Sequence, residues 1–285
     1  MGKTDRVWYS EVAKNLLAKT GASTIEEAIL LLIDKKLSTF GALKPPVDLR
    51  MVASTFGISS HFNYVPMSSA ARLRPEGNGY VIDVNNANNE QRQRFSIAHE
   101  IGHKALLDRG IRITKHRGNA FYPTEEREEE EICDAIGAAI LGLRSDVIHA
   151  HLNATGVTFR TIERVSSEHN TSFEATLRAF LRYCDFPAAG VYCEMHGGLI
   201  AGVANNFIVR RAYHSASFSP IITADQVFSN VACLRDAMRQ QGKVVETTET
   251  LLIHEQKRLF QTEAKRMKIY VEEQPKVGVV LLVSQ

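Results

Sequence analysis

The most informative residues of this chain are the five from His99 to His103, which form an H-E-x-x-H pattern. If this segment is helical, the two histidines lie one turn apart on one face, and that spacing allows both imidazoles to bind a single zinc ion. Glu100 then lies beside the metal, where its carboxylate can take a proton from a bound water. Because so short a pattern also occurs by chance, the surrounding residues must decide whether it is a metal site.

A catalytic zinc site uses three protein ligands and leaves one position for water. The acidic run at 125–131 supplies several candidates for the third ligand. Glu130 is followed four residues later by Asp134, so both side chains fall on one face of a helix. Gly137 and Ala138 on the same face are small enough to let this helix lie against the histidine helix. We therefore predict that Glu130 is the third metal ligand.

Other residues are candidates for supporting roles around this metal site. Asp134 is predicted to accept the free N–H of a ligand histidine and so fix its tautomer and orientation. Glu129 and Glu131 remain the alternatives to Glu130 as the third ligand. A further donor is needed to stabilise the oxyanion, and spacing does not select among three candidates. These candidates are Tyr122, His116 and His149.

The local sequence predicts the elements that position these side chains. Residues 79–85 are typical of a strand, and 90–107 are typical of a helix that carries the histidines and ends before Gly110. Behind Thr124, the acidic residues suit the positive end of a helix dipole, and apolar residues continue this helix to Leu143. The strand at 80–84 is predicted to offer an open edge to which an extended substrate segment can add as a further strand.

Residues 158–183 predict two helices, the second beginning with a capping box of Thr171 and Glu174. This pair is a candidate for a DNA-binding helix-turn-helix, but its basic residues are matched by acidic ones, which favours a packing role. The basic residues are Arg160, Arg164, Arg178 and Arg182, and the acidic ones are Glu163, Glu168, Glu174 and Asp185. Beyond residue 186, short strands, including 199–204, and a long helix at 225–241 indicate a second α+β domain.

Composition excludes several classes of function. The 285 residues are enough for about two domains, and hydrophobic and charged contents of 44% and 23% are ordinary for a globular protein. A net charge of +2 is too small to indicate a nucleic-acid surface or an anionic membrane. The chain shows no apolar signal segment and no apolar run long enough to span a bilayer, so we expect a cytoplasmic protein.

The four cysteines form no C-x-x-C pair and are expected to be reduced, mostly buried thiols. They are Cys133, Cys184, Cys193 and Cys233. A redox-sensing role for Cys184 or Cys193 is the alternative, and buried free cysteine is the more common case.

Several stretches together resemble the ImmA/IrrE metallopeptidases. Residues 92–103 are close to that family's R-F-t-x-A-H-E-x-G-H block, and 79–85 look like the strand that precedes it. Residues 130–141 are similar to its E-x-E-A-[ND]-x-F-A-A-x-L-L block. This chain departs from that block at Ile132, Cys133 and Ile136, all outside the predicted ligand set. The resemblance runs from about residue 46 to 143 and also implies that Glu130 is the third ligand.

The resemblance implies an α+β protein of three parts. These are a minimal gluzincin-like zinc peptidase domain at 1–145, a helix-turn-helix-like helical segment at 146–185, and a GAF-like sensor domain at 186–285. The implied activity is that of a zinc metalloendopeptidase, with Mn²⁺ as an alternative metal. Its implied substrate is a helix-turn-helix repressor, whose cleavage derepresses stress, DNA-damage-response or mobile-element genes. The signal or small molecule that the last domain would bind is not identified by the residues.

The alternative function is a transcriptional regulator that binds DNA or senses a signal and whose metal site is not catalytic. Direct DNA binding is not favoured, because the net charge is weak. Glu100 argues against a purely structural metal site, since such a site needs no general base. The sequence therefore favours the peptidase.

Overall fold

The structure is a computed structural model that describes nine segments of the chain. They are residues 8–38, 44–111, 124–196, 206–219, 222–229, 231–240, 243–253, 256–271 and 274–284. The chain divides into two compact units. The N-terminal unit contains Thr4–Val147 and Val165–Ala179, and the C-terminal unit contains Ile148–Arg164 and Phe180–Gln285. Each unit combines helices with a sheet, which confirms the predicted α+β class. The division into three domains at residues 145 and 185 stays a prediction.

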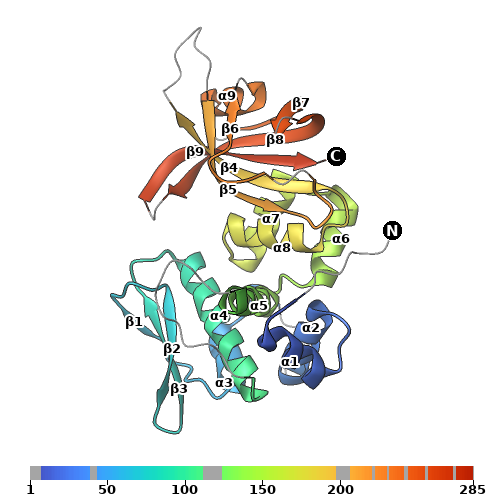
Figure 1. Ribbon diagram of the computed structural model, residues 1–285. Coiled ribbons are helices and arrows are strands. Elements are labelled where there is room, and N and C mark those ends of the chain that lie inside the picture. The colour runs from blue at the N-terminus through green and yellow to red at the C-terminus, as the bar shows by residue number, and fades with distance from the viewer. Residues whose placement is uncertain are drawn as a thin grey trace. The chain divides into compact units, whose positions relative to one another are not determined.

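The N-terminal unit has a layered arrangement around two long helices. Its helices include α1 (Glu11–Thr20), α2 (Ile25–Leu37), α3 (Leu49–Thr55), α4 (Glu90–Asp108) and α5 (Thr124–Ile140), and its strands are β1 (Asn63–Val65), β2 (Ala71–Glu76) and β3 (Gly79–Asn85). Figure 1 shows the small sheet on one side of α4, α5 on the other side, and α1 and α2 beyond α5. The core between these layers buries Ile82 of β3, Ile97 and Ile101 of α4, and Ile136 of α5.

Helix α4 begins and ends where local chemistry requires. The side chain of Asn89 accepts a hydrogen bond from the backbone N–H of Arg92 (2.9 Å), which satisfies one of the free donors of the first turn. At the other end, Gly110 has a φ of 65°, a left-handed conformation that glycine adopts without steric cost. The helix predicted at 90–107 is therefore confirmed within one residue at its end, and it carries both histidines of the motif.

The small sheet has the order β1-β3-β2, so β3 is its central strand. It runs parallel to β1 and antiparallel to β2, with Asp83 opposite Asn63 on one side and Ile82 opposite Leu73 on the other. The open edge predicted at 80–84 is therefore wrong, because both sides of this strand are already paired. The four consecutive buried residues of β3 are typical of a central strand, and β1 and β2 form the two edges of the sheet instead.

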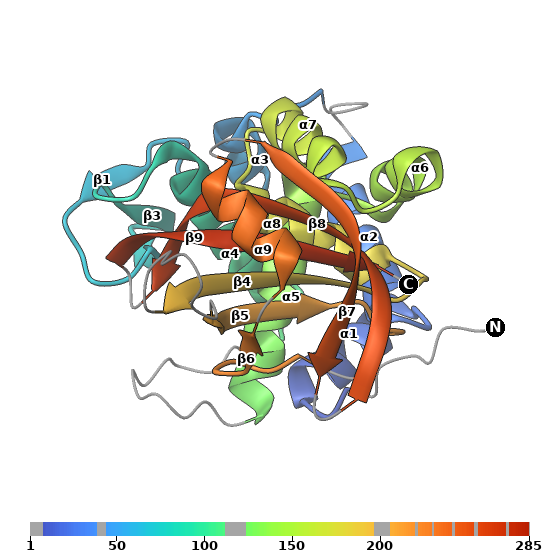
Figure 2. The ribbon, with the colours of Figure 1, turned by 90° about the horizontal axis from the view of Figure 1, so that it is seen from above.

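The C-terminal unit is built on a six-stranded sheet of order β6-β5-β4-β9-β8-β7, in which all neighbours are antiparallel. Its strands are β4 (Ala188–His196), β5 (Asn206–His214), β6 (Val227–Ser229), β7 (Val244–Ile253), β8 (Gln256–Val271) and β9 (Gln274–Ser284). Figures 1 and 2 show α9 (Ala232–Arg239) against one face of this sheet. On α7, the backbone N–H of Phe159 donates to Glu263 of β8 (2.8 Å).

The long helix predicted at 225–241 is wrong in its first half. Asp225 has a φ of 62°, which a helix cannot accommodate, and residues 227–229 pair with β5 as strand β6. Among the described residues of this stretch, Ala232–Arg239 are helical. The alternation of exposed and buried residues in β6, with Phe228 buried between two exposed neighbours, is a strand period. The strand predicted at 199–204 lies outside the described residues.

Helices α6 (Ser145–Thr155), α7 (Phe159–His169) and α8 (Phe173–Tyr183) form the middle of the chain, and α7 and α8 contribute residues to both units. The capping box predicted at Thr171 and Glu174 is wrong, because α8 begins one residue later with a simple N-cap. Ser172, whose Oγ accepts from the backbone N–H of Ala175 (3.1 Å), is the capping residue. Thr171 instead shares a buried hydrogen bond with Thr176 (2.8 Å), because the turn at Asn170 directs its side chain inward.

The four cysteines are buried and none forms a disulfide, which confirms the predicted reduced thiols. Burial raises the pKa of Cys184 to about 11 and raises the pKa of Cys193 further. Since the thiolate is the reactive form, these shifts do not favour redox sensing by either residue. Among the helices of the described segments, none is both long and apolar enough to cross a bilayer.

Candidate metal centre

Helices α4 and α5 bring the two histidines and Glu130 together. The ligand atoms of His99, His103 and Glu130 all lie within 4.8 Å of one another. The two Nε2 atoms of the histidines are 3.1 Å apart. The carboxylate oxygens of Glu130 lie 3.3 Å from Nε2 of His99 and 3.4 Å from Nε2 of His103. Three donors from two helices thus converge on one point.

These separations fit a tetrahedral zinc ion. Zinc binds imidazole nitrogen and carboxylate oxygen at about 2.0–2.2 Å, so two ligand atoms at neighbouring corners of a tetrahedron lie about 3.4 Å apart. The observed separations of 3.1, 3.3 and 3.4 Å are close to that value, and the latter two join the histidines to different oxygens of the Glu130 carboxylate. The donor set of two imidazoles and one carboxylate is also one that zinc uses in catalytic sites. The three residues therefore fit the metal that the sequence predicts.

The convergence depends on a close crossing of α4 and α5. A Cβ atom added at Gly137 of α5 would lie 3.0 Å from the backbone nitrogen of His99 and 3.2 Å from the carbonyl carbon of Ala98. A Cβ atom added at Gly102 of α4 would lie 3.1 Å from the carbonyl oxygen of Cys133. A Cβ atom at either position would make contacts tighter than most in proteins, so the backbone of the neighbouring helix would have to shift by a few tenths of an ångström. The two glycines thus allow the close approach of the helices that brings the ligands together.

Replacing Gly137 by alanine should disturb this crossing. The new methyl group meets backbone, which cannot rotate away, so we expect a cost of about 1–3 kcal/mol from overpacking that exceeds the gain of about 1 kcal/mol in helix propensity. Thermal unfolding should show a lower midpoint, and zinc affinity should fall as Glu130 moves away from the histidines.

The matched control is Ala138→Gly, which lowers helix propensity by about 1 kcal/mol without adding an atom at the crossing. Its zinc affinity should equal that of the wild type. Equal zinc affinities for Gly137→Ala and Ala138→Gly would contradict the assigned role of the crossing.

Hydrogen bonds behind the histidines orient their rings. Because a carboxylate can only accept, His99 must donate its Nδ1–H to Asp134 (2.9 Å), which leaves Nε2 as the ring nitrogen that faces Glu130. On the other ring, Nδ1 of His103 lies 3.4 Å from a carboxylate oxygen of Glu129 and 3.3 Å from Sγ of Cys133. The structure thus places Asp134 where its predicted role requires, and that role stays a prediction.

The two alternative ligands have other surroundings. Glu129 is buried and lies behind His103 on the Nδ1 side, away from the converging Nε2 atoms. Glu131 lies 3.6 Å from Arg127 on the same helix. The position of Glu129 behind His103 was not predicted from the sequence, although its spacing from Cys133 is a signal for it. Glu129 and Cys133 are four residues apart, as Glu130 and Asp134 are, so α5 presents two such pairs side by side.

The charges at the site are strongly coupled. Burial lowers the pKa of His99, but its hydrogen bonds with Asp134 and Glu130 outweigh burial and raise the pKa to about 10. Burial raises the pKa of Glu130, and the contacts with His103 and His99 more than offset this, so its pKa lies well below the usual range. In the metal-free protein, therefore, the imidazole of His99 is protonated on both nitrogens and positively charged at neutral pH, while Glu130 is negatively charged.

Zinc binding should consequently release protons. A metal ligand histidine must be neutral, and His99 is protonated below pH 10 in the metal-free chain, so binding at pH 7 should expel roughly one proton or more per ion. The apparent zinc affinity should rise with pH up to about that pKa. Calorimetric titration in buffers of different ionisation enthalpy measures the number of protons released. A binding enthalpy that is independent of the buffer would contradict this prediction.

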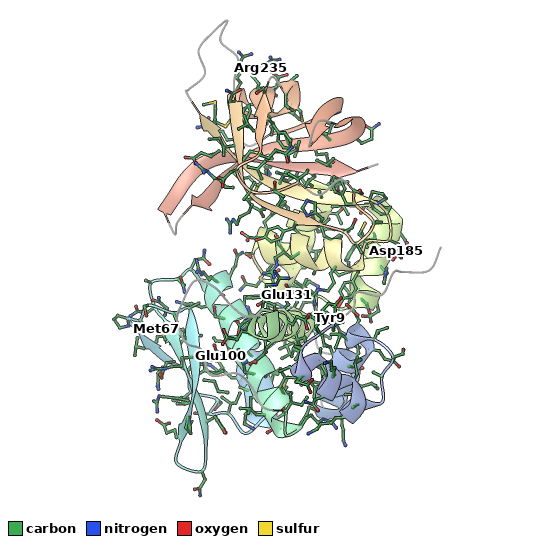
Figure 3. All side chains as sticks on the ribbon, in the orientation of Figure 1. Tyr9, Met67, Glu100, Glu131, Asp185 and Arg235 are labelled. Carbon is green, nitrogen blue, oxygen red and sulfur yellow. The ribbon has the colours of Figure 1, made fainter. Side chains whose placement is uncertain are left out.

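Glu100, the predicted general base, lies between α4 and the small sheet, as Figure 3 shows. One of its carboxylate oxygens accepts a hydrogen bond from the backbone N–H of Leu73 on β2 (2.9 Å). It follows the ligand candidate His99 directly on α4. Of the three candidate oxyanion donors, Tyr122 and His116 lie outside the described residues. The third, His149, lies on α6 in the C-terminal unit, 4.0 Å from Asp185.

Comparisons with known proteins find similarity to metallopeptidases over the stretch that contains the candidate metal ligands. Residues 54–180 match the peptidase M78 family model, described as the IrrE N-terminal-like domain. The Radiation response metalloprotease IrrE of Deinococcus radiodurans is 34% identical over 122 residues, which cover 42% of this chain and 35% of that protein. The chain thus spans about a third of the length of this curated relative.

A solved structure shows that the fold extends further along the chain. A Mycobacterium tuberculosis transcriptional regulator shares 15% sequence identity with a TM-score of 0.60, and the match covers 96% of this chain and 81% of that one. At this identity the likeness concerns the fold alone. The stretch that matches the family model, in contrast, includes the histidine motif, Glu130 and helices α4 and α5 of this chain. Residues 54–180 of this chain are therefore similar to the IrrE N-terminal-like domain of the M78 peptidases.

Proposed function

We propose that this protein is a zinc-dependent endopeptidase that inactivates a helix-turn-helix transcriptional repressor by cleaving it. The observation that carries the proposal is the convergence of His99, His103 and Glu130 at separations of 3.1–3.4 Å, with the carboxylate of Glu100 following His99 on the same helix. A structural metal site has no use for that last carboxylate, whereas hydrolysis of a peptide bond requires a base for the attacking water. The name of the Deinococcus relative, a radiation response metalloprotease, supports the same class of activity.

The residues have separate tasks in the proposed reaction. His99, His103 and Glu130 would hold zinc, which when bound polarises a water molecule and the substrate carbonyl. Glu100 takes a proton from the attacking water and delivers it to the leaving amine. The bond from Leu73 holds one of its oxygens and leaves the other available for this proton. Asp134 keeps His99 in the tautomer that presents Nε2 to the metal.

The exposed edge of β2 is the proposed docking site for the substrate. Its pairing with β3 uses one side of the strand, while the N–H of Leu73 is directed at Glu100 on the other side. An extended peptide that adds to this edge would therefore pass the general base. Pro75 has no N–H to donate, so pairing should be restricted to the part of β2 before it. This assignment replaces the predicted docking on 80–84.

The remaining parts of the proposal concern the cellular role. A repressor as substrate would connect cleavage to a stress, DNA-damage-response or mobile-element programme, as the ImmA/IrrE resemblance implies. Cytoplasmic localisation follows from such a partner. A GAF-like sensor at 186–285 and its signal stay predictions, and Mn²⁺ remains the alternative to Zn²⁺.

The decisive experiment first identifies a helix-turn-helix repressor gene next to the gene for this protein and uses its product as the substrate. Purified wild-type protein loaded with zinc or manganese is mixed with the repressor, and fragments are identified by mass spectrometry. We expect one specific cleavage, which a chelator stops and added metal restores. An intact repressor after incubation with fully metal-loaded wild-type protein would count against proteolysis of this substrate.

A further inference from the structure

A chain of hydrogen bonds runs from helix α8 to the metal centre. One oxygen of Asp134 accepts from Nδ1 of His99 (2.9 Å), and its other oxygen accepts from Nη2 of Arg178 (2.8 Å). Arg178 lies 44 residues further along the chain, on α8, and belongs to the same unit as both partners. The carboxylate that orients the ligand histidine is thus itself held by a cation from another helix.

Arg178 is placed by contacts that do not involve Asp134. Just before α8, the amide of Asn170 donates to Glu90 at the start of α4 (2.6 Å), and Nδ1 of His169 bonds the carbonyl oxygen of Leu141 (2.9 Å). On α8 itself, Leu177 is fully buried beside Arg178. These contacts fix the helix against the ends of α4 and α5, so Arg178 reaches Asp134 from an independently held support.

The chemistry of the pair favours a positioning role. Asp134 lies on a helix rich in carboxylates, four residues after Glu130, so without a nearby cation it faces repulsion from its own helix. A guanidinium donates from fixed, planar N–H groups, which constrains the direction of the bond as well as supplying charge. The hydrogen bond from Arg178 to one oxygen of Asp134 fixes the rotation of the carboxylate. It therefore also fixes which oxygen accepts from His99.

We infer that Arg178 is a positioning residue of the metal centre, which sets zinc affinity by holding Asp134 in the orientation that aligns His99. This inference rests on the proposed function, since it assigns a task at the same metal site. It also gives α8 a role in that site that differs from the DNA contact considered for the two-helix segment. Arg178 does not touch the metal or the substrate, and it acts through Asp134.

The test compares zinc affinities of full-length variants by competition with a chromophoric chelator. Arg178→Gln should weaken zinc binding by about tenfold, the lower end of the range for partners outside the ligand shell. Asp134→Asn should weaken it at least as much, and the double variant should lose no more than Asp134→Asn alone, because both changes break one chain of bonds. The visible spectrum of bound Co²⁺ should change in Arg178→Gln.

Two further variants separate positioning from general stability. Arg182→Gln makes the same chemical change one turn later on α8 and should leave zinc affinity and the Co²⁺ spectrum unaltered. Arg178→Lys keeps the charge without the planar donors and should bind zinc with an affinity between those of wild type and Arg178→Gln. It serves as the test variant if Arg178→Gln does not fold.

The possible failures are distinguishable. Wild-type zinc affinity in Arg178→Gln, or losses that multiply in the double variant, would overturn this inference alone. The same holds if Arg178→Lys is the variant measured and its affinity equals that of the wild type. A wild-type chain that binds no zinc would overturn the proposed function along with it.

Discussion

Replacing Glu100 by glutamine is expected to reduce the rate of repressor cleavage by about 10²–10⁴-fold while leaving zinc bound. The glutamine carbonyl oxygen can still accept the hydrogen bond from the N–H of Leu73, which Glu100 accepts at 2.9 Å in the wild type. The side chain therefore keeps its place but cannot take a proton from water. The measurement is single-turnover cleavage at saturating repressor, with zinc content determined on the same samples.

Two controls connect the loss to proton transfer. Zinc content and the thermal unfolding midpoint of Glu100→Gln should match those of the wild type, because no metal ligand changes. Glu100→Asp keeps a carboxylate on a stem one methylene shorter, so we expect a rate between those of wild type and the glutamine variant. A decrease of less than about tenfold in Glu100→Gln with full zinc content would remove Glu100 from the role of general base.

The metal centre could be predicted from sequence because its parts are local. His99 and His103 are four residues apart on one helix, and Glu130 and Asp134 repeat that spacing on another, so helical periodicity alone places each pair on one face. Small residues at the contact between the two helices, above all Gly137, then indicate which face of α5 packs against α4. The structure brings these residues together, and the family match covers the same stretch.

Features that depend on long-range pairing could not be predicted in this way. The apolar run of β3 indicates a strand, but its position between β1 and β2 is a property of the sheet, so the prediction of an open edge at 80–84 is wrong. Arg178 carries no local signal for its bond to Asp134, since the two are 44 residues apart. In the same way, Asp225 breaks a helical pattern through a backbone conformation that its neighbours do not reveal.

The second large effect is expected for Glu130→Gln, which should lower zinc affinity by more than about 100-fold, the upper limit usual for partners outside the ligand shell. The amide is nearly the same size as the carboxylate, so the crossing of α4 and α5 should survive. It lacks the negative charge, however, that both compensates the metal and lies 3.3–3.4 Å from the two histidines. Chelator competition measures the loss, and repressor cleavage at limiting zinc should stop.

The neighbouring variant Glu131→Gln tests whether the loss of zinc affinity in Glu130→Gln is specific to residue 130 or results from removing any negative charge from α5. Glu131 lies 3.6 Å from Arg127 and takes no part in the ligand cluster, so its amide variant should bind zinc as the wild type does. If general negative charge attracted the metal, the two variants would weaken binding equally, since each removes one charge from the same helix. A loss confined to Glu130→Gln requires direct ligation, because only a bond to the metal distinguishes adjacent carboxylates so sharply.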